Sequence, residues 1–154
     1  MKHTSGFTLI EIFISLTIII GIGASLLFLL GNKKTGALQS NAEIIAARLS
    51  EVQSRAIAGV SGSSWGMHFN NVTSTSPFYD VFEGSSYSTT TYQYQPTNEI
   101  EFQTPASGTS TDIAFTRLTG RIGATSTIVI RLKLNTSETK TITVTPMGEI
   151  TVSK

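Results

Sequence analysis

The chain contains no cysteine, only 4 prolines and 2 histidines among its 154 residues, and few charges, with a net charge of +1. Without cysteine, a disulfide framework, a thiolate nucleophile and a cysteine zinc site are all excluded. The near-neutral charge argues against a nucleic-acid protein, which would need a basic stripe. No Gly-x-Ser-x-Gly or His-Glu-x-x-His signature occurs either.

The remaining polar residues do not form a recognisable catalytic or metal motif. His68 stands alone on a predicted strand, where a histidine is far more often structural than catalytic. Two carboxylate pairs, Asp80 with Glu83 and Glu99 with Glu101, lack the spacing of a calcium loop. The sequence therefore predicts no enzyme, no cofactor and no metal site.

What the chain does have is one long apolar run, from Phe7 to Leu30. As a helix rising about 1.5 Å per residue it would reach roughly 36 Å, enough to cross a hydrocarbon core of about 30 Å. A cleaved secretory signal usually has a shorter apolar region followed by a small-x-small site. We therefore predict a retained membrane segment rather than a removed signal peptide.

Glu11 is the one carboxylate in this run. "TLIE", from Thr8 to Glu11, matches the Ser/Thr-x-x-Glu capping box, and a carboxylate in the first turn suits the helix dipole. A role in capping the helix would therefore be enough to explain Glu11. Whether Glu11 has a second role has to be judged from the neighbouring residues.

"GFTLIE", Gly6 to Glu11, follows a short polar leader containing Lys2 and precedes the apolar run. The whole pattern resembles the N-terminal processing signal of type IV prepilins and pseudopilins. The resemblance implies that prepilin peptidase cleaves after Gly6 and methylates the new amine of Phe7. A glycine suits such a cleavage site because a backbone without Cβ can approach a catalytic centre closely.

The same resemblance implies a role for Glu11 in filament assembly. In this family the matching glutamate pairs with the terminal amine of a neighbouring subunit, and a carboxylate in an apolar setting is acceptable when it is paired. Phe7 and Glu11 are also i and i+4 on one helix, so a pair within one chain is equally reachable. The implied partners are prepilin peptidase, other pilin subunits, the inner-membrane assembly machinery and, before assembly, membrane lipid.

The helical pattern continues beyond the membrane run. From Ala37 to Ile57 apolar residues recur at helical spacing, which predicts one buried face. Gly31–Asn32 offers a helix end, whereas the resemblance implies a single helix from about Phe7 to Ala58. The expected face consists of Leu38, Ile45, Leu49, Val52 and Ala56.

After Gly59 short strand-like runs alternate with turn residues. The predicted fold class is α+β, a long N-terminal helix packed on a C-terminal antiparallel sheet domain. Predicted strands are Trp65–Asn70, Phe78–Phe82, Glu99–Phe102, Asp112–Leu118, Thr127–Leu134, Thr139–Thr145 and Glu149–Val152. The predicted domains are a leader (1–6), a transmembrane and assembly helix (7–31), an amphipathic helix (32–58) and a β-rich head (59–154). The predicted core includes Trp65, Phe69, Phe102, Phe115, Ile128, Ile130 and Val144.

The later part of the chain resembles the H-type (GspH/FimT-like) minor pseudopilins. "RLSEVQSRAIAG", "WGMHF" and "KTITVTPMGEITV" with its Gly148 turn carry this second resemblance. Phe28 stands where familiar major pilins usually carry a helix-bending proline, and the C-terminal cysteine pair of those proteins is absent. Both departures weaken a major-pilin interpretation.

These observations favour a structural subunit, a minor pilin or pseudopilin of a type IV pilus or a type II secretion-like filament. It would be a single-pass protein of the inner membrane with its head exported to the periplasm or cell surface. The alternatives are a major pilin, a DNA-uptake minor pilin with a local patch of Arg117, Arg131 and Lys133, and an anchored β domain that does not polymerise. The role of the Ser/Thr/Tyr-rich loop 84–97 stays open.

Overall fold

The computed structural model describes residues 8–72, 76–88 and 92–154, without the side chains of 26–35. The chain divides into two compact units, Met1–Gly36 and Ala37–Lys154, which are described separately below. We call the second unit the head.

Helix α1 (Leu9–Ile57) contributes to both units. The prediction of one helix from about Phe7 to Ala58 is confirmed to within the usual uncertainty of helix ends. The alternative end at Gly31–Asn32 is wrong, because both residues are helical. Helix α1 instead ends before Gly59, whose φ of +63° lies in the left-handed region that glycine tolerates.

Within the head, α1 buries one face. Each of the five predicted apolar residues is exposed by 1% or less, as the spacing of three, four and seven residues requires. Burying a Leu, Ile or Val side chain contributes about 1.5–3 kcal/mol, so this face is a principal contribution to the stability of the head. The residues are Leu38, Ile45, Leu49, Val52 and Ala56.

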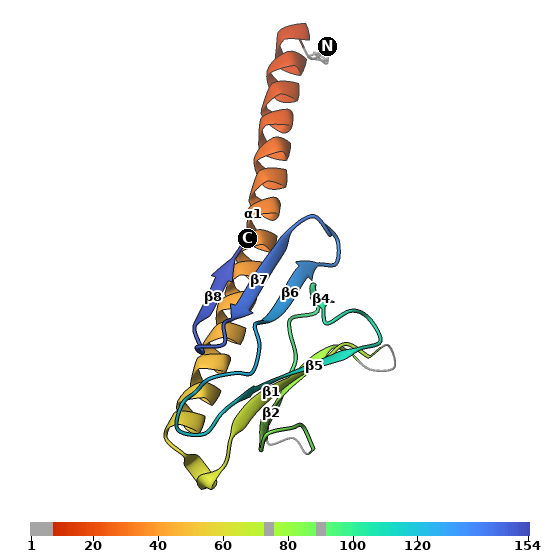
Figure 1. Cartoon of the computed structure of the whole chain (residues 1–154). Coiled ribbons are helices and arrows are strands. Elements are labelled where there is room, and N and C mark those ends of the chain that lie inside the picture. The colour runs from red at the N-terminus through yellow and green to blue at the C-terminus, as the bar shows by residue number, and fades with distance from the viewer. Residues whose placement is uncertain (1–7, 73–75, 89–91) are drawn as a thin grey trace, which may run out of the picture. The chain divides into compact units, whose positions relative to one another are not determined.

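The described residues of the head also form eight strands and a short 3-10 turn, η1 (Val60–Gly62). They form two antiparallel four-stranded sheets, ordered β3-β2-β1-β5 and β4-β6-β7-β8, and Figure 1 shows both beside the C-terminal part of α1. The predicted α+β class is thereby confirmed. The strands are β1 (Trp65–Asn70), β2 (Phe78–Glu83), β3 (Tyr92–Tyr94), β4 (Ile100–Thr104), β5 (Ser110–Phe115), β6 (Ser126–Leu132), β7 (Thr139–Val144) and β8 (Ile150–Ser153).

Seven of these strands match the predicted ones, with ends shifted by a few residues. The missed strand is β3, a three-residue edge strand inside the polar segment that was predicted to be a loop. The β6–β7 turn closes with a hydrogen bond from Glu138 N to Asn135 O of 3.1 Å, and the β7–β8 turn with one from Gly148 N to Thr145 O of 2.8 Å.

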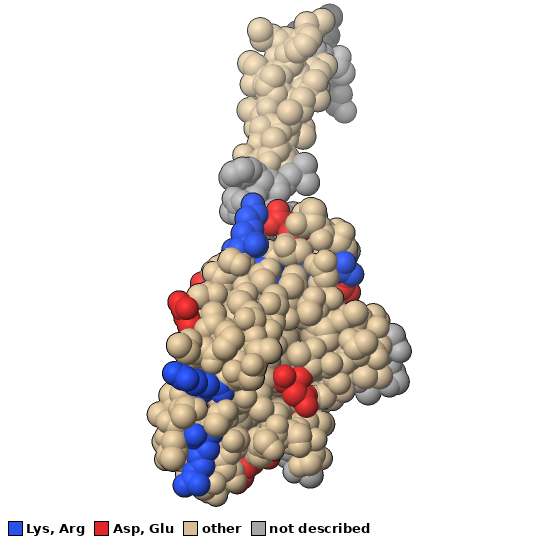
Figure 2. Space-filling model, viewed as in Figure 1, with Lys and Arg blue, Asp and Glu red and all other residues tan. Residues whose placement is uncertain are grey.

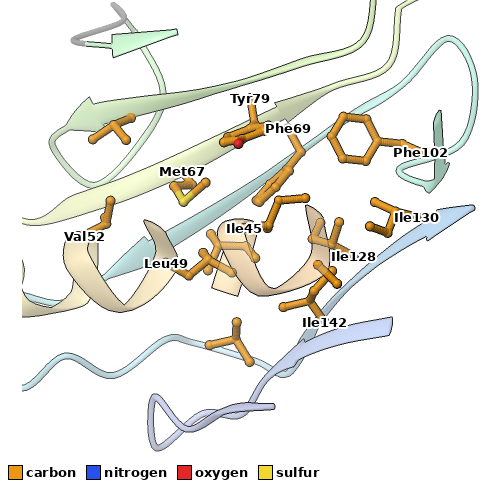
Figure 3. Packing of buried hydrophobic residues seen from close by; sticks show 14 of the residues in the cluster. Ile45, Leu49, Val52, Met67, Phe69, Tyr79, Phe102, Ile128, Ile130 and Ile142 are labelled. Atoms are coloured by element: carbon orange, nitrogen blue, oxygen red, sulfur yellow. The ribbon is translucent and has the colours of Figure 1, made fainter. Parts of the chain in front are cut away.

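The core lies where α1 meets the inner faces of both sheets. Figure 3 shows Ile45 and Leu49 of α1 beside Phe69 of β1 and Ile128 and Ile142 of the other sheet. Strand alternation supplies these side chains from one face of each sheet. All seven predicted core residues are buried.

Gln53 joins α1 to two glycine turns. Its Nε2 donates to Gly120 O at 3.0 Å and to Gly148 O at 2.8 Å, although these glycines are far from it in the sequence. Both glycines have positive φ, +63° and +87°, and both are buried against the helix. One amide side chain therefore fixes the turn before β6 and the turn before β8 onto α1.

Candidate functional site

Glu11 lies in the first turn of α1, where the sequence placed it. Its backbone N–H donates to Thr8 O at 3.1 Å and to Thr8 Oγ1 at 3.4 Å, so Thr8 caps the helix start. In the described part of the chain the Glu11 carboxylate has no hydrogen bond or ion pair. The cap is therefore made by the Thr8 hydroxyl and the Glu11 backbone, which leaves the Glu11 carboxylate available for another partner.

The N-terminal unit exposes apolar side chains along α1. Its few hydroxyls bond within the helix: Ser15 Oγ donates to Glu11 O at 2.8 Å, Thr17 Oγ1 to Ile14 O at 2.8 Å and Ser25 Oγ to Gly21 O at 2.9 Å. These three hydroxyls therefore need no hydrogen bond from water, which is what an apolar environment requires. The exposed side chains are Leu9, Ile10, Ile12, Phe13, Ile14, Leu16, Ile18, Ile19, Ile20 and Ile22, at 51–74% exposure.

No helix within the described residues is long and apolar enough to cross a membrane. The transmembrane role of residues 7–31 stays a prediction. The leader 1–6, the cleavage site Gly6 and the new N-terminus Phe7 lie outside the described residues. Of the three predicted site residues, the structure therefore describes Glu11.

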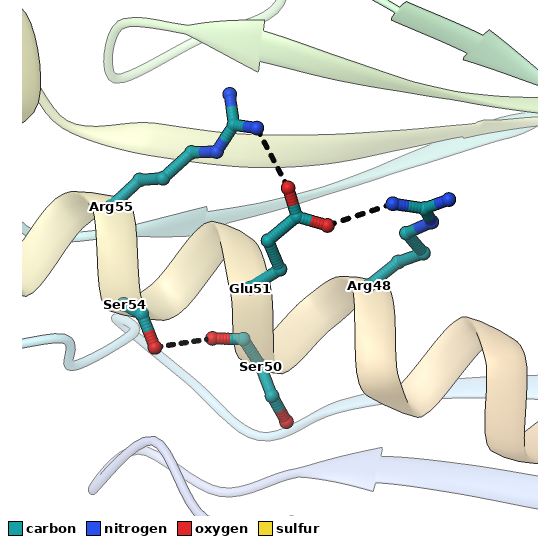
Figure 4. A network of polar contacts seen from close by, with 5 residues as sticks. All are labelled: Arg48, Ser50, Glu51, Ser54 and Arg55. Atoms are coloured by element: carbon teal, nitrogen blue, oxygen red, sulfur yellow. Dashed lines mark hydrogen bonds and ion pairs between the residues drawn. The ribbon is translucent and has the colours of Figure 1, made fainter.

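In the head, Arg48, Glu51 and Arg55 form a charged network on α1 (Figure 4). Glu51 accepts from Arg48 Nη1 at 2.8 Å and from Arg55 Nη2 at 2.7 Å. The two guanidinium groups lie over aromatic rings of β3, Arg48 at 4.6 Å from the centre of Tyr94 and Arg55 at 5.8 Å from that of Tyr92. These cation–π contacts add to the pairing of β3 with β2 and link the edge strand to the helix.

We expect Glu51→Gln to remove part of the acid sensitivity of the head. Hydrogen bonds from Arg48 and then Arg55 hold the pKa of Glu51 below its ordinary value of 4.5. The ionised Glu51 therefore stabilises the folded head above pH 4.5. This contribution is lost as the pH falls through the lower pKa that Glu51 has in the folded state. Because the side chain is 41% exposed, we expect less than about 1 kcal/mol.

The measurement is urea unfolding at pH 7 and pH 3, followed by the fluorescence of Trp65, which is the single tryptophan and is buried. Glu43→Gln, at an exposed carboxylate of the same helix, is the matched control and should keep the wild-type pH dependence. An unchanged pH dependence in Glu51→Gln would show that the arginine pairs contribute nothing to stability.

Another polar cluster, which the sequence did not reveal, lies on strand β1. His68 Nδ1 is 2.5 Å from Asp112 Oδ1 of β5, and the Tyr87 ring stacks on the imidazole with centroids 3.8 Å apart. A carboxylate paired with an imidazole can orient a catalytic base. Here the His68 side chain is only 8% exposed beneath Tyr87, so a substrate has no access to it. Its prediction as a structural histidine agrees with this geometry.

The three basic residues considered for nucleic acid do not lie in one described pocket. Arg131 and Lys133 line a cavity of about 300 Å³, where Arg131 is already paired with Glu101 at 2.7 Å. Arg117 lies beside Gly59 at the end of α1. On the face shown in Figure 2, positive and negative residues are interspersed. Among the residues described, no group of three or more histidines and carboxylates could hold a metal.

A comparison with protein-family models gives no match, and neither does a comparison with curated proteins. Two crystal structures of the type IV minor pilin FimU from Pseudomonas aeruginosa match the fold, with TM-scores of 0.52 and 0.54. Each is 14% identical and covers 76% of this chain, and the match spans 93% and 88% of the two FimU chains. At this identity the likeness concerns the fold alone: the chain has a type IV pilin-like fold.

Proposed function

We propose that this protein is a structural subunit of a type IV pilus or a type II secretion-like filament, as a minor pilin or an H-type pseudopilin. It is made as a precursor in the inner membrane and enters the filament through its N-terminal helix. The head then lies in the periplasm or at the cell surface. No catalysis and no cofactor are part of this function.

The observation that carries the proposal is one helix with two different surfaces on a pilin-like fold. Residues 9–22 of α1 expose apolar side chains, whereas one apolar face of α1 between Leu38 and Ala56 is buried in the head. A monomer in water would gain nothing from so much exposed apolar surface, which marks an interaction or membrane site. The fold shared with FimU supports a filament of equivalent helices as the place where that surface is covered.

In this proposal prepilin peptidase removes residues 1–6 and methylates the amine of Phe7. The apolar helix passes from lipid into the filament bundle without becoming hydrated. Glu11, whose carboxylate is free of partners in the described part of the chain, pairs with the Phe7 amine of a neighbouring subunit. Such a pair would set the axial register of each incoming subunit, because an unpaired charge is costly in an apolar bundle.

Replacing Gly6 with valine is expected to block maturation. The substitution adds a branched side chain where the peptidase must approach the backbone, so the precursor should keep the six-residue leader. Intact-mass measurement of the membrane fraction reads the result directly. Ser5→Val, one residue before the cleavage site, is the control and should still be processed. Cleavage of the Gly6→Val precursor would contradict the proposed site.

The proposed function is tested by mass spectrometry of sheared surface filaments and of the membrane fraction. A peptide beginning at methylated Phe7, at low abundance beside another pilin, would support the minor subunit. Dominant abundance would indicate a major pilin. If the protein stays in the membrane beginning at Met1 and is absent from filaments, it is an anchored β domain that does not polymerise.

A further inference from the structure

The outward face of the sheet β3-β2-β1-β5 carries a second buried cluster, separate from the main core. Along β1, Met67 and Phe69 belong to the core, so Gly66 and His68 point to the opposite face. Phe82 of β2 lies across Gly66, where a Cβ would come within 2.3 Å of its ring. Phe82 is fully buried although it does not belong to the core cluster.

Titratable side chains from three adjacent strands meet in this cluster. His68 of β1 lies opposite Asp80 of β2 in one register and opposite Asp112 of β5 in the other. Its Nδ1 contacts Asp112 Oδ1, as described above, and the whole residue is 6% exposed. The imidazole is thus flanked by a carboxylate on each side.

Asp80 is only 1% exposed and is incompletely paired. Its Oδ2 accepts a hydrogen bond from the Tyr87 hydroxyl at 2.9 Å, whereas Oδ1 has no hydrogen-bond partner in the described residues. A buried polar atom without a partner loses its hydration with no replacement, which costs free energy. Hydration of Asp80 would therefore favour any movement that admits water.

Tyr87 packs on His68 and binds Asp80. Its ring stacks on His68 with an interplanar angle of 8° and meets Phe82 edge-on with centroids 5.7 Å apart. Burial, followed by the hydrogen bond to Asp80, raises the pKa of Tyr87, so the hydroxyl remains a donor. The neighbouring residues Ser85, Ser86 and Ser88 are exposed. The segment 84–88 is therefore held at its start by the hydrogen bond from Gly84 N to Ser64 O, at 2.8 Å, and beyond Gly84 by the side chain of Tyr87.

We propose that residues 84–88 are a strap that opens and closes over this face without unfolding the head, with Tyr87 as its latch. The aromatic contacts and the hydroxyl bond of Tyr87 favour the closed form, and hydration of the Asp80 carboxylate favours the open form. Opening leaves the sheet intact, because no residue of the strap belongs to a strand. The open strap exposes Asp80 and His68 beside Asp112, whose side chain is already 41% exposed in the closed form, so opening adds the Asp80 carboxylate to the accessible surface of the head.

The test uses a spin label on the strap of the full-length protein in detergent micelles. Since the chain has no cysteine, Ser86→Cys provides a single labelling site on an exposed residue. In this background Tyr87→Phe should convert the spectrum from an immobile to a mainly mobile component, at least about a tenfold change in their ratio. Asp80→Asn should shift the ratio the other way, because it removes the buried charge and keeps an acceptor for the Tyr87 hydroxyl.

The double variant Tyr87→Phe/Asp80→Leu separates this mechanism from a simple loss of contacts. It should return the label to the immobile form, since neither a buried polar group at position 80 nor its hydrogen-bond donor is then present. Tyr92→Phe, at an exposed tyrosine of β3, is the matched control and should change nothing.

Three results would each overturn the proposal. The label could stay immobile in Tyr87→Phe, or it could stay mobile in the double variant. Alternatively, the opening in Tyr87→Phe could be accompanied by loss of the native Trp65 fluorescence, which would show that the strap does not open independently of the head.

Discussion

Replacing Gly148 with alanine is expected to destabilise the head by about 3 kcal/mol, among the largest effects of a single added methyl group in this chain. Gly148 has a φ of +87°, and a Cβ there would lie 2.2 Å from Gln53 Nε2 and 2.3 Å from Gly120 O. The left-handed backbone costs a residue with a Cβ about 1–2 kcal/mol. Displacing Gln53 also breaks its bonds to both turns, at about 0.5–1.5 kcal/mol each.

Gly108→Ala is the matched control for this experiment. Gly108 has nearly the same φ, +85°, but a Cβ there would meet no atom within 4 Å. It should therefore show the backbone penalty alone, about 1–2 kcal/mol. Urea unfolding of the full-length protein, followed by Trp65 fluorescence, measures both variants. Equal losses in the two variants would show that Gln53 does not fix these turns in solution.

The helix and most strands were predictable because their signals are local. In α1, residues such as Leu49 and Val52 recur at helical spacing, and in β6 and β7 apolar and polar residues alternate. The edge strand β3 could not be predicted, because three residues in a polar segment carry no periodic signal. Strand β3 pairs with β2 and contacts Arg48 and Arg55 of α1, which are distant in the sequence from Tyr92 and Tyr94.

The division into two sheets was also beyond the sequence. Strand β1 pairs with β5, and β4 pairs with β6, so neighbours in space are not always neighbours in the chain. Such pairings are chosen by which strands can share a buried face with α1. The alternation of short strands and turn residues correctly predicted an antiparallel sheet domain. It did not predict that the strands divide into two sheets.

The candidate site shows the same contrast between local and distant signals. Glu11 could be identified from contiguous residues, "GFTLIE". Thr8 caps the helix as the capping pattern predicts, whereas the return bond of the Glu11 carboxylate is not present among the described residues. His68 was judged alone, since Asp112 lies 44 residues away and only the register of β1 with β5 brings them together. No motif search could have joined Asp80, Tyr87 and His68.

Replacing Glu11 with alanine is expected to leave cleavage after Gly6 intact and to deplete the protein from filaments to less than about a tenth of the wild-type level. Removing one partner of a buried ion pair costs about 3–5 kcal/mol, which is more than a hundredfold in an equilibrium. Quantitative mass spectrometry of filament and membrane fractions measures the partition. Ser15→Ala should assemble normally, because the Ser15 hydroxyl bonds within its own helix.

Helix capping is the rival explanation of a defect in Glu11→Ala, and Thr8→Ala distinguishes the two. Thr8 supplies the cap through its own oxygens, so its loss should weaken the first turn while leaving the Glu11 carboxylate in place. If Glu11 sets the register by pairing with an amine, Thr8→Ala should enter filaments far better than Glu11→Ala. Equal depletion of both variants would mean that the helix start, and not the charge, limits assembly. Normal incorporation of Glu11→Ala would remove Glu11 from the assembly mechanism altogether.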